Sequence, residues 1–161
     1  MNLIGIFNRV ANWNSKRYDR QYDHDLSVNL LKEEHQEYFD ANTLVDQLDA
    51  LCDMTYVALG ILWKIDSDNE TLDYNADESH KQVARLLATN TFSPINLIAS
   101  VLTQYEHDKD YPTALAAQMV ITLCMTQMSA MGLDSVESFM ALVVVCDSND
   151  SKSIKKTATH I

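Results

Sequence analysis

Apolar residues recur along most of this chain at intervals of three and four positions, which is the period of an α-helix. Two prolines and three glycines are the strongest breakers in 161 residues, and both prolines stand where a first helical turn tolerates them. The pattern therefore predicts an all-α fold. The predicted helices cover residues 3–13, 26–41, 44–63, 80–88, 94–105, 112–131 and 135–146.

The polar segments between these helices predict the connections. Residues 14–25 and 66–77 are rich in charged and polar side chains and are predicted to be loops, and residues 147–161 are predicted to be a polar tail. Asn42 and Thr43 form a short junction with a suitable N-cap, so the helices on either side are expected to pair as an antiparallel hairpin. We expect one domain over residues 1–161, a helical bundle built around this hairpin.

The second helix of the hairpin carries three acidic residues although it is otherwise largely apolar. Asp46, Asp49 and Asp53 are its only charged residues before Trp63, and their spacing gathers them into an arc of about 60°. Carboxylates crowded at partly buried positions repel one another and lose hydration. No Lys, Arg or His lies on the inner faces of the hairpin to pair with them, so the sequence predicts divalent cations there, chiefly Mg²⁺, with Mn²⁺ possible.

The first helix of the hairpin supplies three glutamates on its inner side. Glu33, Glu34 and Glu37 continue the apolar stripe of Leu26 and Leu30 within an arc of roughly 100°. An EExxE pattern alone more often marks a solvent-facing side of a helix than a functional motif. The alignment of the glutamates with the two leucines favours a functional motif here. Because Mg²⁺ held by a few carboxylates usually also binds substrate phosphates, the residues predict hydrolysis of a phosphate ester or anhydride. The alternative is that the aspartates face a solvent-filled groove or cap neighbouring helices without metal.

Charge and cysteine usage narrow the class of protein. The net charge is −11, and no run of Lys and Arg could neutralise a nucleic-acid backbone, so we expect no binding to DNA or RNA. Cys52, Cys124 and Cys146 are odd in number and far apart, as expected for reduced thiols in a cytoplasmic protein. The apolar runs are short or interrupted, and the opening lacks the features of a signal peptide, so we expect a soluble protein without membrane association.

The hairpin sequence LLKEEHQEYFDANTLVDQLDALCDMTYVALG resembles the paired acidic motifs of the all-α nucleotide pyrophosphohydrolases, the MazG-like family. The opening FNRVANWNSKR and the late stretch GLDSVESFMALVVVCDSNDSK are similar to phage-type members. This resemblance implies a Mg²⁺-dependent enzyme that cleaves a nucleoside triphosphate to a monophosphate and pyrophosphate. Such an enzyme would clean or shape the nucleotide pool, in the host cytoplasm if the protein is phage-encoded.

The resemblance also implies a metal-ligand set. Glu33, Glu34 and Glu37 match the first acidic motif, with Glu34 and Glu37 as the catalytic residues and Glu34 as the candidate acceptor of the proton of water. Asp49 and Asp53 match the second motif, which reads DxxxD here where the family usually has ExxD. Asp46, one turn earlier, is an extra ligand or a neighbour of the ligands.

Substrate contacts are implied at both ends of the chain. Asn149 and Lys152 stand at the Asn-x-x-Lys positions of phage-type members, where the lysine touches phosphate. Trp13 and Asn14 are candidates for stacking on a base and bonding to it, although an aromatic residue at a helix end more often belongs to the core.

The middle of the chain is longer than in compact phage-type relatives. Residues 64–128 are therefore expected to be a helical insertion that either completes the bundle or alters the subunit interface and nucleoside pocket. Because small helical hairpins rarely bury both faces alone, we expect a homodimer or a homotetramer. A second possible function is a catalytically silent module that binds a nucleotide or a partner protein.

Overall fold

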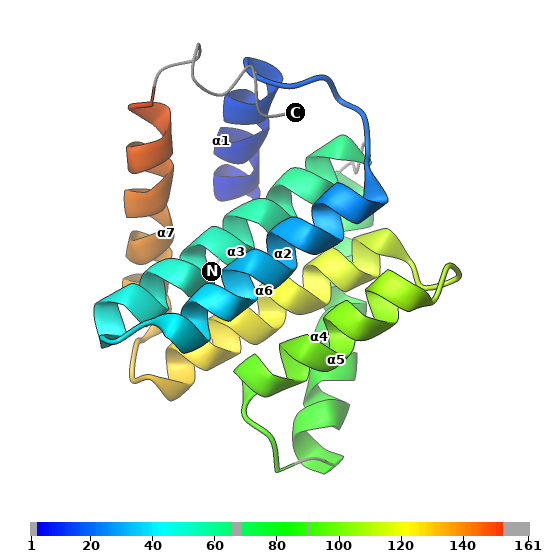
Figure 1. Ribbon diagram of the computed structural model, residues 1–161, viewed down its shortest axis with the longest axis vertical. Helices are drawn as coiled ribbons and strands as arrows, with labels where there is room; N and C mark the ends of the chain where they lie inside the picture. Colours follow the sequence, from blue (N-terminus) through cyan, green and yellow to red (C-terminus); the bar gives the residue numbers. More distant parts are fainter. Residues whose placement is uncertain (1–2, 66–68, 90, 153–161) are drawn as a thin grey trace.

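The computed structural model describes residues 3–65, 69–89 and 91–152. Within these ranges the chain forms helices without any strand (Figure 1), which confirms the predicted all-α class. The helices are α1 (Ile4–Ser15), α2 (His24–Asp40), α3 (Leu44–Lys64), α4 (Asn69–Thr89), α5 (Pro94–His107), α6 (Thr113–Ala130) and α7 (Ser135–Asp150).

Helices α2 and α3 form the expected antiparallel hairpin and lie side by side (Figure 1). Each begins at a side-chain cap: Asp23 accepts a hydrogen bond from the backbone N–H of Leu26 at 3.0 Å, and Thr43 accepts one from Asp46 at 3.1 Å. These caps satisfy backbone donors that a helix start leaves unpaired. They fix where each helix begins, and therefore which side chains of α2 face α3.

Helix α6 lies at the centre of the bundle and packs against α3, α4 and α5 (Figure 1). Val120, Leu123 and Met128 on this helix are completely buried. By length and composition α6 could cross a membrane, but contact with three neighbouring helices already accounts for a helix that is apolar on most sides. The predicted insertion thus provides the packing surface behind α3.

Helices α1 and α7 join the two ends of the described chain (Figure 1). The guanidinium of Arg9 contacts the carboxylates of Asp147 at 2.8 Å and Asp150 at 2.6 Å. The indole N–H of Trp13 donates to the backbone carbonyl of Asn149 at 2.7 Å. These contacts bring the C-terminal end of α7 beside the C-terminal end of α1, and both helices also pack against α3.

Two predicted connections are wrong in part. The acidic segment 66–77 was expected to be a loop, but α4 begins at Asn69; this segment has neither proline nor glycine, and acidic residues tolerate helix well enough when nothing breaks it. The predicted tail begins as helix, because α7 continues to Asp150, where Arg9 pairs with its last turn. Residues 153–161 of the predicted tail lie outside the described part of the chain.

Substitution in α6 tests whether the inserted helices are part of the core. We expect Leu123→Ala, at a fully buried position, to lower the free energy of unfolding by about 2–5 kcal/mol, because it removes buried methyl groups and leaves a cavity. Leu44→Ala, the same change at a position that is 69% exposed, should have little effect. Urea unfolding followed by circular dichroism measures both, and equal losses would contradict the central place of α6.

Candidate active site

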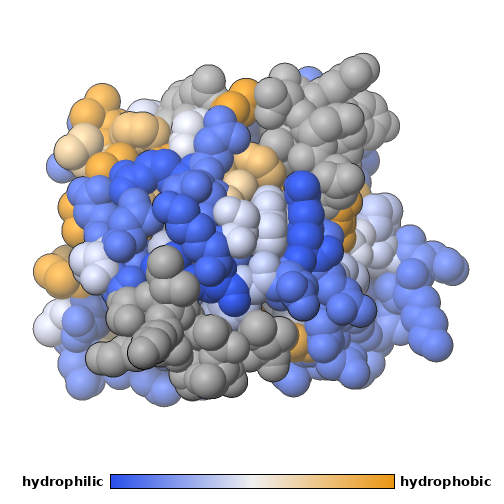
Figure 2. Space-filling model, turned by 90° about the horizontal axis from the view of Figure 1, so that it is seen from above, coloured by the Kyte–Doolittle hydropathy of each residue, from blue (hydrophilic) through white to orange (hydrophobic). Residues whose placement is uncertain are grey.

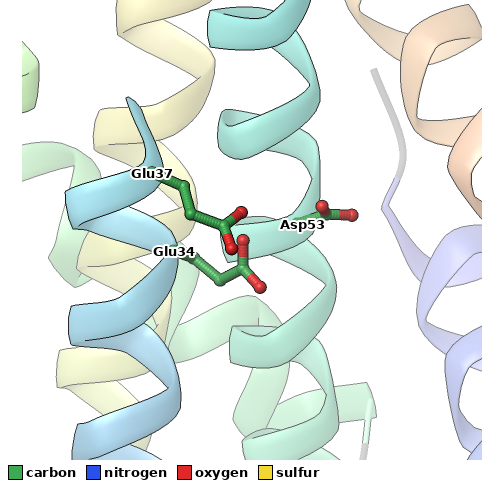
Figure 3. A group of neighbouring side chains, drawn as sticks. All are labelled: Glu34, Glu37 and Asp53. Carbon is green, nitrogen blue, oxygen red and sulfur yellow. The ribbon is translucent and has the colours of Figure 1, made fainter. Parts of the chain in front are cut away.

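Three carboxylates from the hairpin converge between α2 and α3. One oxygen each of Glu34, Glu37 and Asp53 lie within 4.8 Å of one another, and Figure 3 shows the two glutamates reaching from α2 toward α3. Residues three apart on a helix share a face, so Glu37 lies on the same face of α2 as Glu34. The neighbouring helix brings Asp53 to the same level.

The electrostatics of this group favour protonation or a bound cation. Burial raises the pKa of Glu34 to about 8, with further increases from its hydrogen bond with Glu37 and from the charge of Asp53. Burial also raises the pKa of Asp53 to about 6, together with the charges of Asp49 and Glu37, against which Lys152 acts in the opposite direction. At neutral pH the cluster therefore holds a proton that a positive ion could displace.

The donor set fits a hard divalent cation. One carboxylate oxygen of Glu34, Oε2, is buried and has no hydrogen-bond partner among the described residues. An orphaned carboxylate oxygen beside two further carboxylates is costly unless something positive binds it. Oxygen ligands from a few carboxylates are those that Mg²⁺ and similar ions prefer, so this acidic cluster is suited to a metal.

The other predicted ligands lie outside this group. Asp49 is exposed one turn before Asp53, and its charge raises the pKa of both Glu34 and Asp53, so it lies within electrostatic reach. Glu33 and Asp46 are exposed, and the structure does not bring them into the cluster. Asp46 stands in the first turn of α3, about two turns before Asp53.

A pocket of about 370 Å³ opens beside the carboxylates. Glu34 and Asp53 both line it. The four residues predicted to contact substrate also line it, although they come from opposite ends of the chain: Trp13, Asn14, Asn149 and Lys152. The structure therefore brings the predicted substrate residues to one cavity, next to the acidic cluster.

The aromatic wall of this pocket is centred on Trp13. Its ring packs edge-on against Tyr56 with centroids 5.8 Å apart and lies 5.9 Å from the ring of Tyr18. The guanidinium of Arg17 lies 4.2 Å from the Trp13 centroid, while the indole N–H is held by the carbonyl of Asn149. Trp13 is thus fixed on several sides before any ligand enters.

Sequence reasoning missed several residues that line the pocket. Tyr56, Gly60 and Lys64 follow Asp53 at positions three, seven and eleven along α3. This spacing places them on the same face as Asp53, so extending the arc of the aspartates along α3 would have found them. Tyr18 lies in the connection after α1, where no periodic pattern points to the pocket.

Comparison with known proteins supports the relation of this site to a known family. Residues 6–73 match the family model of phosphoribosyl-ATP pyrophosphohydrolase. The match covers less than half of the 161 residues, but it includes both acidic helices of the hairpin and agrees with the resemblance seen in their motifs. No curated protein and no solved structure matches the chain.

The raised pKa of Glu34 makes the stability of the metal-free protein depend on pH. A carboxyl group with an ordinary value of 4.5 and a folded value of about 8 binds its proton more tightly in the folded state. Its contribution to stability is therefore full below pH 4.5 and is lost as the pH rises toward 8.

We expect Glu34→Gln to remove part of this pH dependence. After allowance for solvent screening at a half-buried site, the difference should be about 1 kcal/mol between pH 5 and pH 8, or roughly 2–4 °C in Tm. Thermal unfolding in EDTA measures it, and added Mg²⁺ should stabilise the wild type more at pH 8 than at pH 5. If Tm changed with pH in the same way in Glu34→Gln and in the wild type, the raised pKa of Glu34 would be contradicted.

Proposed function

We propose that the chain, whose residues 6–73 match the family model of phosphoribosyl-ATP pyrophosphohydrolase, is a Mg²⁺-dependent nucleoside triphosphate pyrophosphohydrolase of the all-α superfamily. It would cleave an NTP or dNTP to the monophosphate and pyrophosphate and so clean or shape the nucleotide pool in the cytoplasm, that of a host if the protein is phage-encoded. The observation that carries the proposal is the cluster of Glu34, Glu37 and Asp53 at the edge of a nucleoside-sized pocket.

Glu34, Glu37 and Asp53 would hold the metal, with Asp49 close enough to share its charge. When bound, Mg²⁺ supplies positive charge that neutralises the triphosphate and acidifies a water molecule. Mn²⁺ offers similar chemistry with the same oxygen ligands. Glu33 and Asp46 stand outside the cluster, so the proposal does not depend on them.

Glu34 is the candidate proton acceptor. A carboxyl group whose pKa is near the working pH is well suited to general base catalysis, and a neighbouring positive charge lowers the raised pKa of Glu34 so that the carboxylate becomes available. As water attacks, one O–H bond breaks and the proton passes to Glu34. An O–P bond forms to the nucleotide, and the P–O bond to the departing pyrophosphate breaks. Glu37, one turn later on α2, adds a further carboxylate beside the acceptor.

Lys152 is the candidate phosphate contact. Its ammonium donates to the side-chain carbonyl of Asn149 at 2.9 Å, and its charge lowers the pKa of Asp53, so it stands near the carboxylates without forming an ion pair with them in the described structure. A cation in this place favours a polyphosphate chain between the acidic cluster and α7. The nucleoside would then occupy the part of the pocket beside Trp13 and Asn14.

The identity of the nucleotide needs a broad screen. The matched family is named for phosphoribosyl-ATP, which carries a further phosphate on its phosphoribosyl group. Lys64 lines the pocket about 16 Å along α3 from Asp53 by helical rise, where such a remote phosphate could be bound. The panel should therefore include phosphoribosyl-ATP together with canonical and modified triphosphates.

The first test measures pyrophosphate release from this panel with Mg²⁺. We expect Glu37→Gln and Asp53→Asn to lower kcat/KM by about 100-fold or more, because they remove groups that hold the reacting centre. Asp40→Asn, an exposed position on the same helix as Glu37, should retain activity. A smaller loss for Glu33→Gln than for Glu37→Gln would distinguish the cluster from the full EExxE motif.

A catalytically silent module that binds a nucleotide or partner protein is the alternative. It would bind nucleotides in calorimetry but release no pyrophosphate from any member of the panel, with Mg²⁺ or Mn²⁺. That combination would reject the hydrolase and support the binding module.

We also expect a homodimer or homotetramer. Val136, Met140 and Val144 form an apolar stripe along α7 and are 70%, 52% and 62% exposed. Figure 2 shows hydrophobic residues at the side of the molecule where α7 lies. Light scattering should give a multiple of 18.2 kDa, and Met140→Glu should shift the mass toward the monomer because it places a charge in the stripe. A wild-type monomer at micromolar concentration would contradict this expectation.

A further inference from the structure

A second cavity, of about 330 Å³, lies at the junction of α1 and α7. Figure 1 shows the C-terminal ends of these two helices at the same end of the bundle. The lining includes three cations, Lys16, Arg17 and Lys152, and one acid, Asp150; we call this space the basic cavity. It shares only Trp13 and Lys152 with the pocket beside the carboxylates, and none of the clustered carboxylates lines it. In a chain with a net charge of −11, three cations around one small cavity favour the binding of an anion.

Arg17 is the buried cation of this cavity. The residue is only 8% exposed, and its Nη1 and Nη2 donate to the backbone carbonyls of Trp13 at 2.9 Å and Lys152 at 3.1 Å. The partial negative charge of the two helix ends accounts for this position of the guanidinium. These two bonds use two of the five N–H donors of an arginine, and Nε, which is also buried, has no partner among the described residues. The neighbouring backbone therefore satisfies the guanidinium only in part.

No carboxylate of the described residues neutralises Arg17. The side chain forms no ion pair within this part of the chain, and Asp150, the acid in the lining, is paired with Arg9 at 2.6 Å. The ammonium of Lys152 donates to the neutral Oδ1 of Asn149. Buried charges are normally paired, because burial removes their hydration. The basic cavity thus has an excess of positive charge that its own lining does not offset.

The donors of the basic cavity suit a phosphate group. A guanidinium offers N–H groups in a planar fork that matches the oxygen atoms of phosphate, and the ammonium groups of two lysines add charge around it. A water molecule takes up about 30 Å³ of liquid, so a cavity of about 330 Å³ has room for a tetrahedral anion together with several water molecules.

We propose that the basic cavity is a binding site for a phosphate group, in which Lys16, Arg17 and Lys152 hold the anion between α1 and α7. The group belongs to free orthophosphate or to a phosphate ester of a small molecule, which offer the same oxygen atoms. The bound anion supplies the negative charge that the buried guanidinium lacks, and so stabilises the contact of α7 with α1. This site is separate from the proposed hydrolytic site and does not rest on it.

Thermal unfolding and calorimetry with orthophosphate as the probe test this site. EDTA is present throughout, so that phosphate cannot bind through a metal ion at the acidic cluster. For the wild type we expect Tm to rise by about 3–6 °C when phosphate is at ten times its Kd. Sodium chloride of the same ionic strength should raise Tm less, because it only screens charge.

Variants locate the bound anion. We expect Lys16→Gln to weaken phosphate binding about fivefold, because it removes an exposed charge from the basic cavity. Arg17→Gln should weaken it about tenfold or more, because it removes a buried charged donor. Lys64→Gln makes the same change as Lys16→Gln but in the wall of the pocket beside the carboxylates only, and should leave the phosphate affinity unchanged.

Two phosphate esters, glycerol 3-phosphate and adenosine 5′-monophosphate, distinguish the sources of the phosphate group. Binding of orthophosphate that Lys16→Gln weakens and Lys64→Gln does not supports the site with a free anion as its ligand. The same dependence for an ester alone supports the site with an ester as its ligand. Because Lys16 is exposed, its variant keeps the test decisive even if Arg17→Gln does not fold.

Two results overturn the proposal. One is a Tm that orthophosphate and both esters raise no more than chloride does. The other is an affinity that Lys16→Gln leaves unchanged, or that Lys64→Gln lowers as much. Either result leaves Arg17 as a cap of two helix ends. The measurements contain neither Mg²⁺ nor a triphosphate, so they are independent of pyrophosphate release, whose absence rejects the hydrolase alone.

Discussion

The close packing of α2 against α3 gathers three carboxylates at one place and partly buries two of them, Glu34 and Asp53, and the rest of the site is arranged around that constraint. Glu34 and Asp53 both have raised pKa values, so the apo hairpin stores unfavourable electrostatic energy. Such a site persists only when the surrounding packing holds it. Helix α6 provides that support by packing against α3.

The hairpin was predictable from sequence because its signals are local. The signals are Thr43 as the cap of α3, the recurrence of apolar residues every three or four positions, and the aspartates on an otherwise apolar helix, and all of them act within a few turns. Helical periodicity predicted the direction of each carboxylate around its helix axis. Periodicity does not predict how far α3 is shifted along its axis relative to α2. That relative position brings Asp53 next to Glu34 and leaves Asp46 outside the cluster.

The pocket was less predictable because its walls come from distant segments. Trp13 and Asn149 are 136 positions apart in the sequence, and no pattern within α1 or α7 states that they meet. Their assignment as substrate residues came from a family resemblance, and the structure places both in one cavity. The first turns of α4, from Asn69 to residue 77, were expected to be a loop for a different reason: acidic composition alone does not end a helix when breakers are absent.

The carboxylate cluster and the pocket depend on contacts at very different separations along the chain, so they form at different times. The carboxylate cluster depends on a hairpin of neighbouring helices, whose contacts are local and form early. The pocket needs Asn149 and Lys152 to reach α1, a contact that closes a long loop and emerges late during synthesis. A nascent chain would therefore pair α2 with α3 well before it could enclose a nucleotide, so that its capacity to bind one would coincide with the docking of α7.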